Sequence, residues 1–165
     1  MRWRRVLILA FFATGCDQGV DPFPPVDPSA DGAISGIITY QNWPPLDSLF
    51  DLRIVAFRDF PPGDVVGAVL GGRAIVHPGL GDTALVPFLV DSLRFRFSLP
   101  PGEYRYLAVV HRFGRNIFSD WRAVGQYDTD SDPLVPTPVV VPAGDTLRGI
   151  AIPVDFVNRP PPPFP

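Results

Sequence analysis

Lysine is absent from this chain of 165 residues, and glutamate occurs once, as Glu103. Both are good helix formers, and methionine, another, also occurs once, so the composition disfavours a helical fold. The sixteen aspartates, 22 prolines and 15 glycines favour turns instead. Short apolar stretches separated by such turns are typical of an all-β domain.

Long apolar runs are also missing. No stretch approaches the roughly 20 apolar residues that a membrane-spanning helix requires. A short apolar run over 6–13 follows three arginines within the first five residues, and small residues come after it. A basic end, a short apolar run and a small-residue exit form the pattern of a secretory signal peptide. We therefore expect 1–15 to be a signal peptide.

The single cysteine, Cys16, cannot form a disulfide within the chain, and a leftover cysteine in an exported protein needs its own explanation. The stretch Ala13–Cys16 resembles a bacterial lipobox, in which the cysteine carries thioether-linked diacylglycerol and becomes the first residue after cleavage. Leucine is commoner than alanine at the first of these positions. The resemblance implies a lipoprotein anchored through Cys16 in the cell envelope, at the outer membrane, at the inner membrane facing the periplasm, or at the cell surface. The alternative is an ordinary secreted protein in which Cys16 is incidental.

The charge balance narrows the range of partners. Removal of the signal peptide would leave 11 arginines against 17 acidic residues, a net charge near −6. An acidic chain without a basic stripe argues against a nucleic-acid partner. It also lacks the Lys/Arg cluster that docks proteins on anionic lipid. We therefore expect contact with the membrane through the N-terminal lipid.

Four regions are expected along the chain: the signal peptide over 1–15, a tether over 16–32, a β domain over 33–157 and a proline-rich tail over 158–165. The tether has four prolines, four aspartates and few apolar residues, so it cannot bury enough surface to offset the entropy of ordering. If extended, it would hold the domain roughly 50 Å from the membrane.

Strands are predicted where β-branched and aromatic residues alternate with polar ones. The sequence predicts strands over 33–40, 51–57, 92–99, 104–110, 139–141 and 146–156. Another strand, or a pair of strands, is expected over 116–127, around Trp121 and Tyr127. Over 104–110 both faces become apolar, as expected of a strand in the middle of the fold. Between 59 and 92, frequent glycine and proline leave two interpretations open: short strands near 73–77 and 87–90, or a short helix near 65–70. Pro153 cannot donate to a ladder, so the last strand is expected at an edge or with its N–H side exposed.

A set of spaced residues suggests a family. Gly32, Ile34 and Gly36 match a G-x-I/V-x-G opening strand, and an F-x-F-x-L strand that turns through Pro-Gly into a tyrosine-led strand is matched by Phe95, Phe97, Leu99, Pro101, Gly102 and Tyr104. The pattern resembles the carboxypeptidase-regulatory-like, transthyretin-like domains of bacterial surface proteins. The resemblance implies a single antiparallel β-sandwich, Ig-like or transthyretin-like, of about seven strands. In such a domain the motif from Phe95 to Tyr104 forms a hairpin. It also implies a non-catalytic accessory or adhesive module.

Residues that could carry catalysis are few. The two histidines, His77 and His111, lie near predicted strand ends, and no H-E-x-x-H, C-x-x-C or G-x-S-x-G motif is present. A dispersed Ser/His/Asp triad is recognised only by its geometry. We predict structural or surface roles for both histidines, no cofactor and no enzymatic activity.

One acidic stretch has two interpretations. Asp128, Asp130 and Asp132 resemble the start of a calcium loop of the D-x-D-x-D kind, but the glycine and the distal glutamate of an EF-hand are missing. A solvated acidic turn is the first interpretation, and calcium binding is the alternative.

Aromatic residues near predicted loops also have two interpretations. Trp43, Phe60, Trp121 and Tyr127 could form a platform for a glycan or a protein, or they could close the ends of the β domain. The sequence alone does not decide between these roles.

The basic strand face formed by Arg94, Arg96 and Arg105 is expected to pair with nearby aspartates or to face water rather than to bind an anion. The sequence as a whole predicts an envelope lipoprotein with a structural or protein-interaction role. Glycan or calcium binding is the alternative function.

Replacing the cysteine tests the anchor. Because Cys16→Ser removes the thiol that would carry the lipid, we expect uncleaved precursor to accumulate. Mass spectrometry of the N-terminal peptide is expected to find a diacylglycerol adduct in the wild type and none in the variant. Ser29→Ala, in the expected tether, serves as the control and is expected to be processed like the wild type. A Cys16→Ser protein that stays membrane-bound while precursor never accumulates would contradict the prediction.

Overall fold

The computed structural model describes residues 27–82, 85–130 and 132–162. Cys16 and the expected signal peptide lie outside the described residues. The elements in chain order are β1 (Gly32–Gln41), the 3-10 turn η1 (Leu46–Ser48), β2 (Asp51–Phe57), α1 (Val65–Leu70), β3 (Ala74–His77), β4 (Ser92–Leu99), β5 (Gly102–Tyr104), β6 (Tyr106–Arg112), β7 (Trp121–Gln126), β8 (Val139–Val141) and β9 (Thr146–Asp155). Within the described ranges, no helix has the length and hydrophobicity that crossing a bilayer requires.

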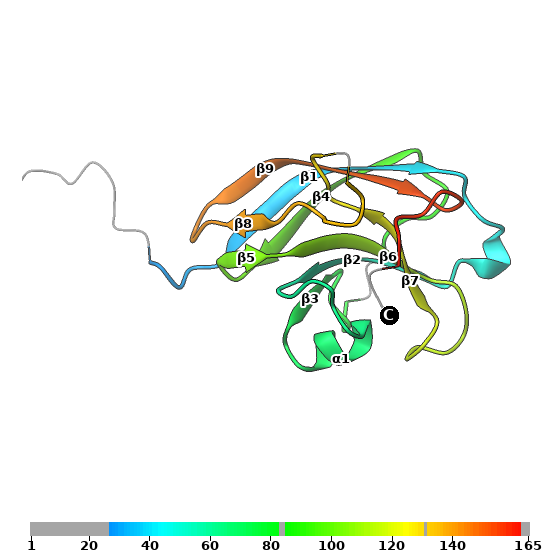
Figure 1. Ribbon diagram of the computed structural model, residues 1–165, viewed down its shortest axis with the longest axis horizontal. Helices are drawn as coiled ribbons and strands as arrows, with labels where there is room; N and C mark the ends of the chain where they lie inside the picture. Colours follow the sequence, from blue (N-terminus) through cyan, green and yellow to red (C-terminus); the bar gives the residue numbers. More distant parts are fainter. Residues whose placement is uncertain (1–26, 83–84, 131, 163–165) are drawn as a thin grey trace, which may run out of the picture.

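One curved sheet dominates the molecule. Seven strands follow the order β3-β2-β6-β7-β9-β1-β4, and β5 and β8 form a separate pair. In Figure 1, β9, β1 and β4 lie above β2, β6 and β3, so the sheet folds back over itself. At its two ends, the ring of His77 in β3 stacks on that of Phe97 in β4, with centroids 5.2 Å apart. The prediction of an all-β fold is thus confirmed, in the form of a sheet that is nearly barrel-like.

The prediction of a purely antiparallel domain is wrong at one pair of strands. β1 and β9 run parallel, with Ala33 opposite Thr146 at one end and Gln41 opposite Asp155 at the other. The other ladders of the large sheet are antiparallel. Side chains alternate between faces in the same way in both kinds of ladder. The sequence pattern therefore identified both strands without indicating their relative direction.

A bulge and a close approach shape the β1–β9 contact. The step from Ile34 to Gly36 on β1 lies opposite the longer step from Leu147 to Ile150 on β9. Gly149 lies in this bulge with a φ of 84°, a conformation that glycine adopts without strain. A Cβ on Gly36 would overlap the Ile150 carbonyl oxygen and lie 2.6 Å from its carbonyl carbon. The motif glycine at position 36 is therefore required by the approach of β9.

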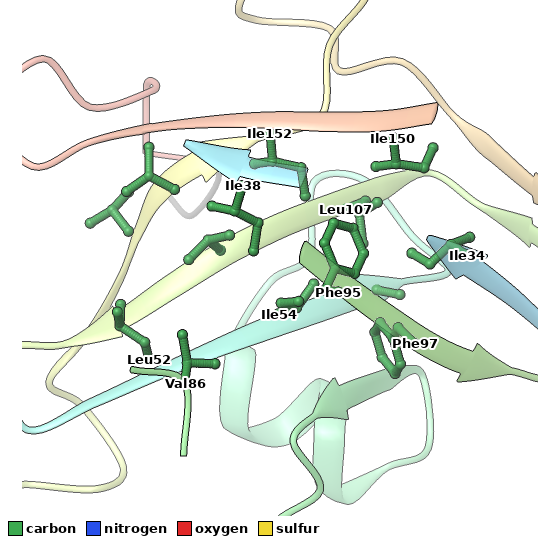
Figure 2. Packing of buried hydrophobic residues seen from close by; sticks show 14 of the residues in the cluster. Ile34, Ile38, Leu52, Ile54, Val86, Phe95, Phe97, Leu107, Ile150 and Ile152 are labelled. Atoms are coloured by element: carbon green, nitrogen blue, oxygen red, sulfur yellow. The ribbon is translucent and has the colours of Figure 1, made fainter. Parts of the chain in front are cut away.

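The main core lies between the two facing halves of the sheet. Figure 2 shows side chains from both halves of the sheet meeting there, all at most 8% exposed: Ile34, Ile38, Phe95, Phe97, Ile150 and Ile152 from β1, β4 and β9, and Ile54 and Leu107 from β2 and β6. Complete burial of one such side chain stabilises the fold by roughly 1.5–3 kcal/mol.

A second core lies on the opposite, outer face of β2 and β6. There Val55, Phe57, Tyr106, Ala108 and Val110 pack with residues of α1 and β3. The strand predicted over 104–110 is divided in the structure, because Tyr104 belongs to β5. The strand buried on both faces is β6, whose inner face meets the main core and whose outer face meets the second core beneath α1.

The region from 59 to 92 contains both a helix and a strand. Asp64 is the N-cap of α1, and its carboxylate accepts hydrogen bonds from the backbone N–H groups of Val66 (3.2 Å) and Gly67 (2.6 Å). β3 matches the strand predicted near 73–77 and pairs with β2. The segment 87–90 is irregular, so the strand predicted there is wrong.

The expected hairpin through Pro101 and Gly102 does not form. β4 pairs with β1, whereas β6 pairs with β2 and β7. Gly102, with a φ of 131°, turns the chain from one half of the sheet to the other, and the Tyr104 hydroxyl donates to the Pro100 carbonyl at 2.9 Å. Turn residues specify that the chain reverses, but not that the flanking strands share a ladder.

Pro153 lies in an interior strand, which corrects the prediction of an edge. β9 lies between β7 and β1 in the sheet. However, the β7–β9 ladder consists of one pair, Gly125 opposite Val154. A proline nitrogen has no hydrogen to donate, so Pro153 is tolerated beside a ladder that consists of a single pair.

The close packing of β1 against β9 predicts different outcomes for two glycines. Gly36→Ala forces a Cβ into the Ile150 backbone, so we expect a loss of about 3 kcal/mol in the free energy of unfolding. Gly63→Ala is the control, because a Cβ there meets nothing within 4 Å, and its effect is expected to stay within about 0.5 kcal/mol. Urea denaturation measures both. Equal midpoints for the two variants would contradict the assigned contact.

Candidate functional site

A groove of about 320 Å³ opens on the outer face of the sheet beside α1. Its size falls at the lower end of ligand-binding sites, which range over about 300–1,000 Å³. Aliphatic side chains form most of its lining: Val55, Val65, Val66, Val69, Leu70, Val76, Leu80, Val110 and Ile117. Phe118 and Trp121 complete the apolar part.

The groove exists because α1 is too short to cover the sheet beneath it. Six helical residues rise about 9 Å, whereas the seven-residue ladder of β2 and β6 is roughly 23 Å long. Phe57, Tyr106 and Ala108 lie in the second core near the helix. The opposite end of the ladder, with Arg53, Val110 and Arg112, lines the groove instead.

Exposed apolar side chains surround the opening. Leu70 is 72% exposed, Leu80 66%, Phe118 66% and Ile117 53%. They come from α1, from the segment after β3 and from the loop between β6 and β7. Single exposed hydrophobic residues are ordinary, but a group of them around a hollow marks a contact surface.

The ion pair between Arg53 and Asp51, at the end of the groove, stabilises the fold. The Nε of Arg53 donates to both carboxylate oxygens of Asp51, at 3.1 and 3.0 Å. Its Nη1 donates to the carbonyls of Pro78 (2.7 Å) and Gly79 (3.0 Å). Arg53 is 7% exposed, so these bonds compensate for its lost hydration and fasten the 78–79 turn to β2.

Arg112, at the same end, is less engaged. Its guanidinium lies 5.8 Å from the Phe50 ring centre and 6.0 Å from that of Trp121. Its Nη2 makes one long hydrogen bond, of 3.5 Å, to the Phe50 carbonyl. Its Nε is buried and has no partner among the described atoms, and no described carboxylate lies within ion-pair distance. Since Asp51 is neutralised by Arg53, Arg112 gives this end of the groove a net positive charge.

The two histidines lie apart from each other and from the groove lining. His77 is at the edge of the sheet, stacked on Phe97. His111 is fully buried on the inner side of β6, where its Nε2 lies 2.9 Å from the Ser48 carbonyl and its ring meets Phe156 edge-on. Burial lowers the pKa of His111 to about 4, although the hydrogen bond to Ser48 opposes the shift.

The three aspartates at 128, 130 and 132 form successive turns. One carboxylate oxygen of each accepts a backbone hydrogen bond from two residues ahead: Asp130 N at 3.2 Å, Asp132 N at 2.8 Å and Leu134 N at 3.0 Å. Among the described residues, no group of three or more His, Cys, Asp or Glu side chains is arranged to hold a metal ion. These hydrogen bonds are those of an acidic turn, the first interpretation from sequence, and calcium binding stays the alternative.

The four loop aromatics do not share a surface. Trp43 and Tyr127 pack against the main core, and the indole N–H of Trp43 donates to the Val90 carbonyl at 3.0 Å. Phe60 and Trp121 pack against the second core. Trp121 also lines the groove, and its indole N–H donates to the Ile117 carbonyl at 2.8 Å.

The arginines of the predicted basic strand face lie at the surface. Arg96 donates to the Thr146 hydroxyl at 2.8 Å, and Arg105 lies 3.9 Å from Glu103 in an exposed pair. Arg94 is exposed on β4. Exposed pairs of this kind contribute little to stability.

A second hollow, of about 440 Å³, lies between β7 and the start of the proline-rich tail. Arg122 and Arg159 line it together with Pro160–Pro162, Val157 and Trp121. Burial, and then the nearby charge of Arg159, lower the pKa of Arg122. One side of this hollow is an irregular tail, so it is less firmly built than the groove.

The groove is not predicted by the sequence. The four apolar residues at 65, 66, 69 and 70 were part of the region with two open interpretations, and Arg112 was not singled out. One available signal was the apolar character of both faces of 104–110, which implies a covering layer on the outer side. The pattern does not say how far such a layer extends.

Comparison with protein-family models, with curated proteins and with solved structures finds no match for this chain. The resemblances to a lipobox and to carboxypeptidase-regulatory-like domains therefore stay predictions from sequence.

The burial of His111 predicts a pH dependence of stability. Its pKa is about 4 in the folded protein and about 6.5 in an unfolded chain, so only the unfolded state gains a proton between these values. The free energy of unfolding therefore keeps its full value above pH 6.5. It falls as the pH is lowered toward 4, by about 3 kcal/mol in total.

Denaturation in urea at several pH values measures this loss. His111→Gln is expected to be less stable at pH 7 but to show a smaller fall between pH 7 and 4, whereas His77→Gln keeps most of the wild-type fall. Asp155 contributes to the pH dependence of stability in a separate, more acidic pH range. Hydrogen bonds from Asn42, Asn158 and Val157 hold its pKa well below the usual range, so its contribution is lost only below about pH 4. An unchanged fall in His111→Gln would refute the assignment.

Proposed function

We propose that this protein is a lipid-anchored component of the cell envelope whose β domain binds a partner, without catalysis, through the groove beside α1. Support for the anchor comes from the lipobox-like residues that end at Cys16, behind a short apolar run. Support for the binding role comes from the groove. The two parts are independent, since one rests on the N-terminal sequence and the other on the folded domain.

The observation that carries the binding role is the exposed apolar rim. Leu70, Leu80 and Phe118 each leave more than half of their surface in water around a concave apolar lining. Such a patch is unfavourable on an isolated protein and favourable in a complex. The lining offers no nucleophile paired with a base, because its one carboxylate, Asp51, is held by Arg53. This chemistry suits binding.

At the level of fold, we propose that the two facing halves of the sheet form a β-sandwich related to the transthyretin-like accessory domains. The glycines at 32 and 36 support this, because both lie where another strand or turn leaves no space for a side chain. The parallel β1–β9 pair and the turn at Gly102 would then be departures from the usual arrangement. For the alternative functions, glycan and calcium binding, the described residues offer no surface comparable to the groove.

Site-specific photocrosslinking tests the contact surface. A benzoylphenylalanine at position 70, on the groove rim, is expected to crosslink to a partner in the cells that naturally make the protein. The control is position 140, where Val140 is 66% exposed on β8, away from the groove. Immunoblotting and mass spectrometry compare the adducts. Equal yields at the two positions, or no adduct of either a protein or a lipid at 70, would overturn the proposed surface.

A further inference from the structure

We propose that the groove binds a fatty acid, with the alkyl chain along the valine-rich lining and the carboxylate at Arg112. This inference rests on the proposed function, since it names the occupant of the same contact surface. It follows from two properties of the groove: the aliphatic character of its lining and the charge at one end.

The lining suits an alkyl chain. Nine of its side chains are aliphatic, and the polar residues Asp51, Arg53 and Arg112 lie together at one end. Valine and leucine surfaces offer contact to methylene groups but few partners for the amide groups of a peptide.

The charged end suits a carboxylate. Arg53 is saturated by Asp51 and by two carbonyls, so it has little to offer a ligand. Arg112 has a buried Nε without a partner among the described atoms. The rings of Phe50 and Trp121 flank its guanidinium and reduce its contact with water, which strengthens a pair with an anion. The three charged groups at this end sum to +1, so one carboxylate would neutralise them.

Chain length provides the first test. The full chain with Cys16→Ser, which cannot be lipidated, is purified without detergent and titrated with octanoate, decanoate and dodecanoate by calorimetry. Each additional methylene buried in the groove is expected to strengthen binding about fourfold until the groove is filled. Affinity that does not change with chain length would overturn the proposal, and this test needs no groove variant to fold.

The position of the carboxylate provides the second test. A bromine on the carbon next to the carboxylate, in 2-bromododecanoate, is expected to quench Trp121, and the quench should disappear in Trp121→Phe. Arg112→Gln is expected to weaken dodecanoate binding about tenfold and to leave dodecanol binding unchanged. Arg122→Gln is the matched control, because Arg122 lies on the neighbouring strand and is not in the groove lining. Equal weakening by the two arginine variants would overturn the assignment of the head group.

The outcomes separate this inference from the proposed function. If dodecanoate fails to bind while position 70 crosslinks to a protein, the fatty acid is excluded and the contact surface stands. If ultracentrifugation instead finds a dimer that Leu70→Gln dissociates, the occupant is a second copy of the chain and the inference is likewise wrong. If position 70 gives no adduct and dodecanoate does not bind, both proposals fail.

Discussion

The ladder between β2 and β6 is the constraint on which the rest of the structure depends, because both of its faces are buried. Its inner side chains meet those of β1, β4 and β9 in the main core, and its outer side chains meet α1 and β3 in the second. A strand pair of this kind needs apolar residues at successive positions, and 54–57 and 106–110 contain them. The layer over the outer face is short, and the groove is the part of that face left open.

The curvature of the sheet brings its two edge strands together and leaves the outer face of β2 and β6 accessible beside α1. The edges formed by β3 and β4 approach each other, and the stack of His77 on Phe97 covers part of the opening between them. Open edges are the usual sites of unwanted pairing between sheets, so this arrangement leaves fewer free backbone groups. The close approach of β9 to Gly36 is part of the same curvature, since the bulge at Gly149 bends one strand against the other. The fold thus leaves the outer face beside α1 open, with Leu70, Leu80 and Phe118 exposed around it.

Two arginines at one end of the groove have different roles although they belong to neighbouring strands. The hydrogen bonds of Arg53 go to Asp51 and to the 78–79 turn, and its removal would leave a partly buried carboxylate unpaired. Arg112 lies between two aromatic rings with unused hydrogen-bond donors. In the proposed site, Arg53 holds the surrounding backbone in place, and Arg112 has donors available to a ligand. The two arginines differ in role because they contact different residues, and those residues come from segments far apart in the chain.

The sequence by itself determined the all-β class, the strands at 51–57 and 139–141 and the turn chemistry at Gly102, because these depend on alternation and on backbone freedom within a few residues. It left the choice between helix and strand open near 65–70, and it missed the groove. Tertiary structure alone decided that β1 and β9 run parallel, that β4 and β6 belong to different halves of the sheet and that Pro153 is interior. Each of these depends on which distant strand becomes the neighbour, and parallel and antiparallel partners accept the same alternating pattern. The groove depends on how far a six-residue helix reaches across a longer ladder, a length that becomes visible only when the two are packed together.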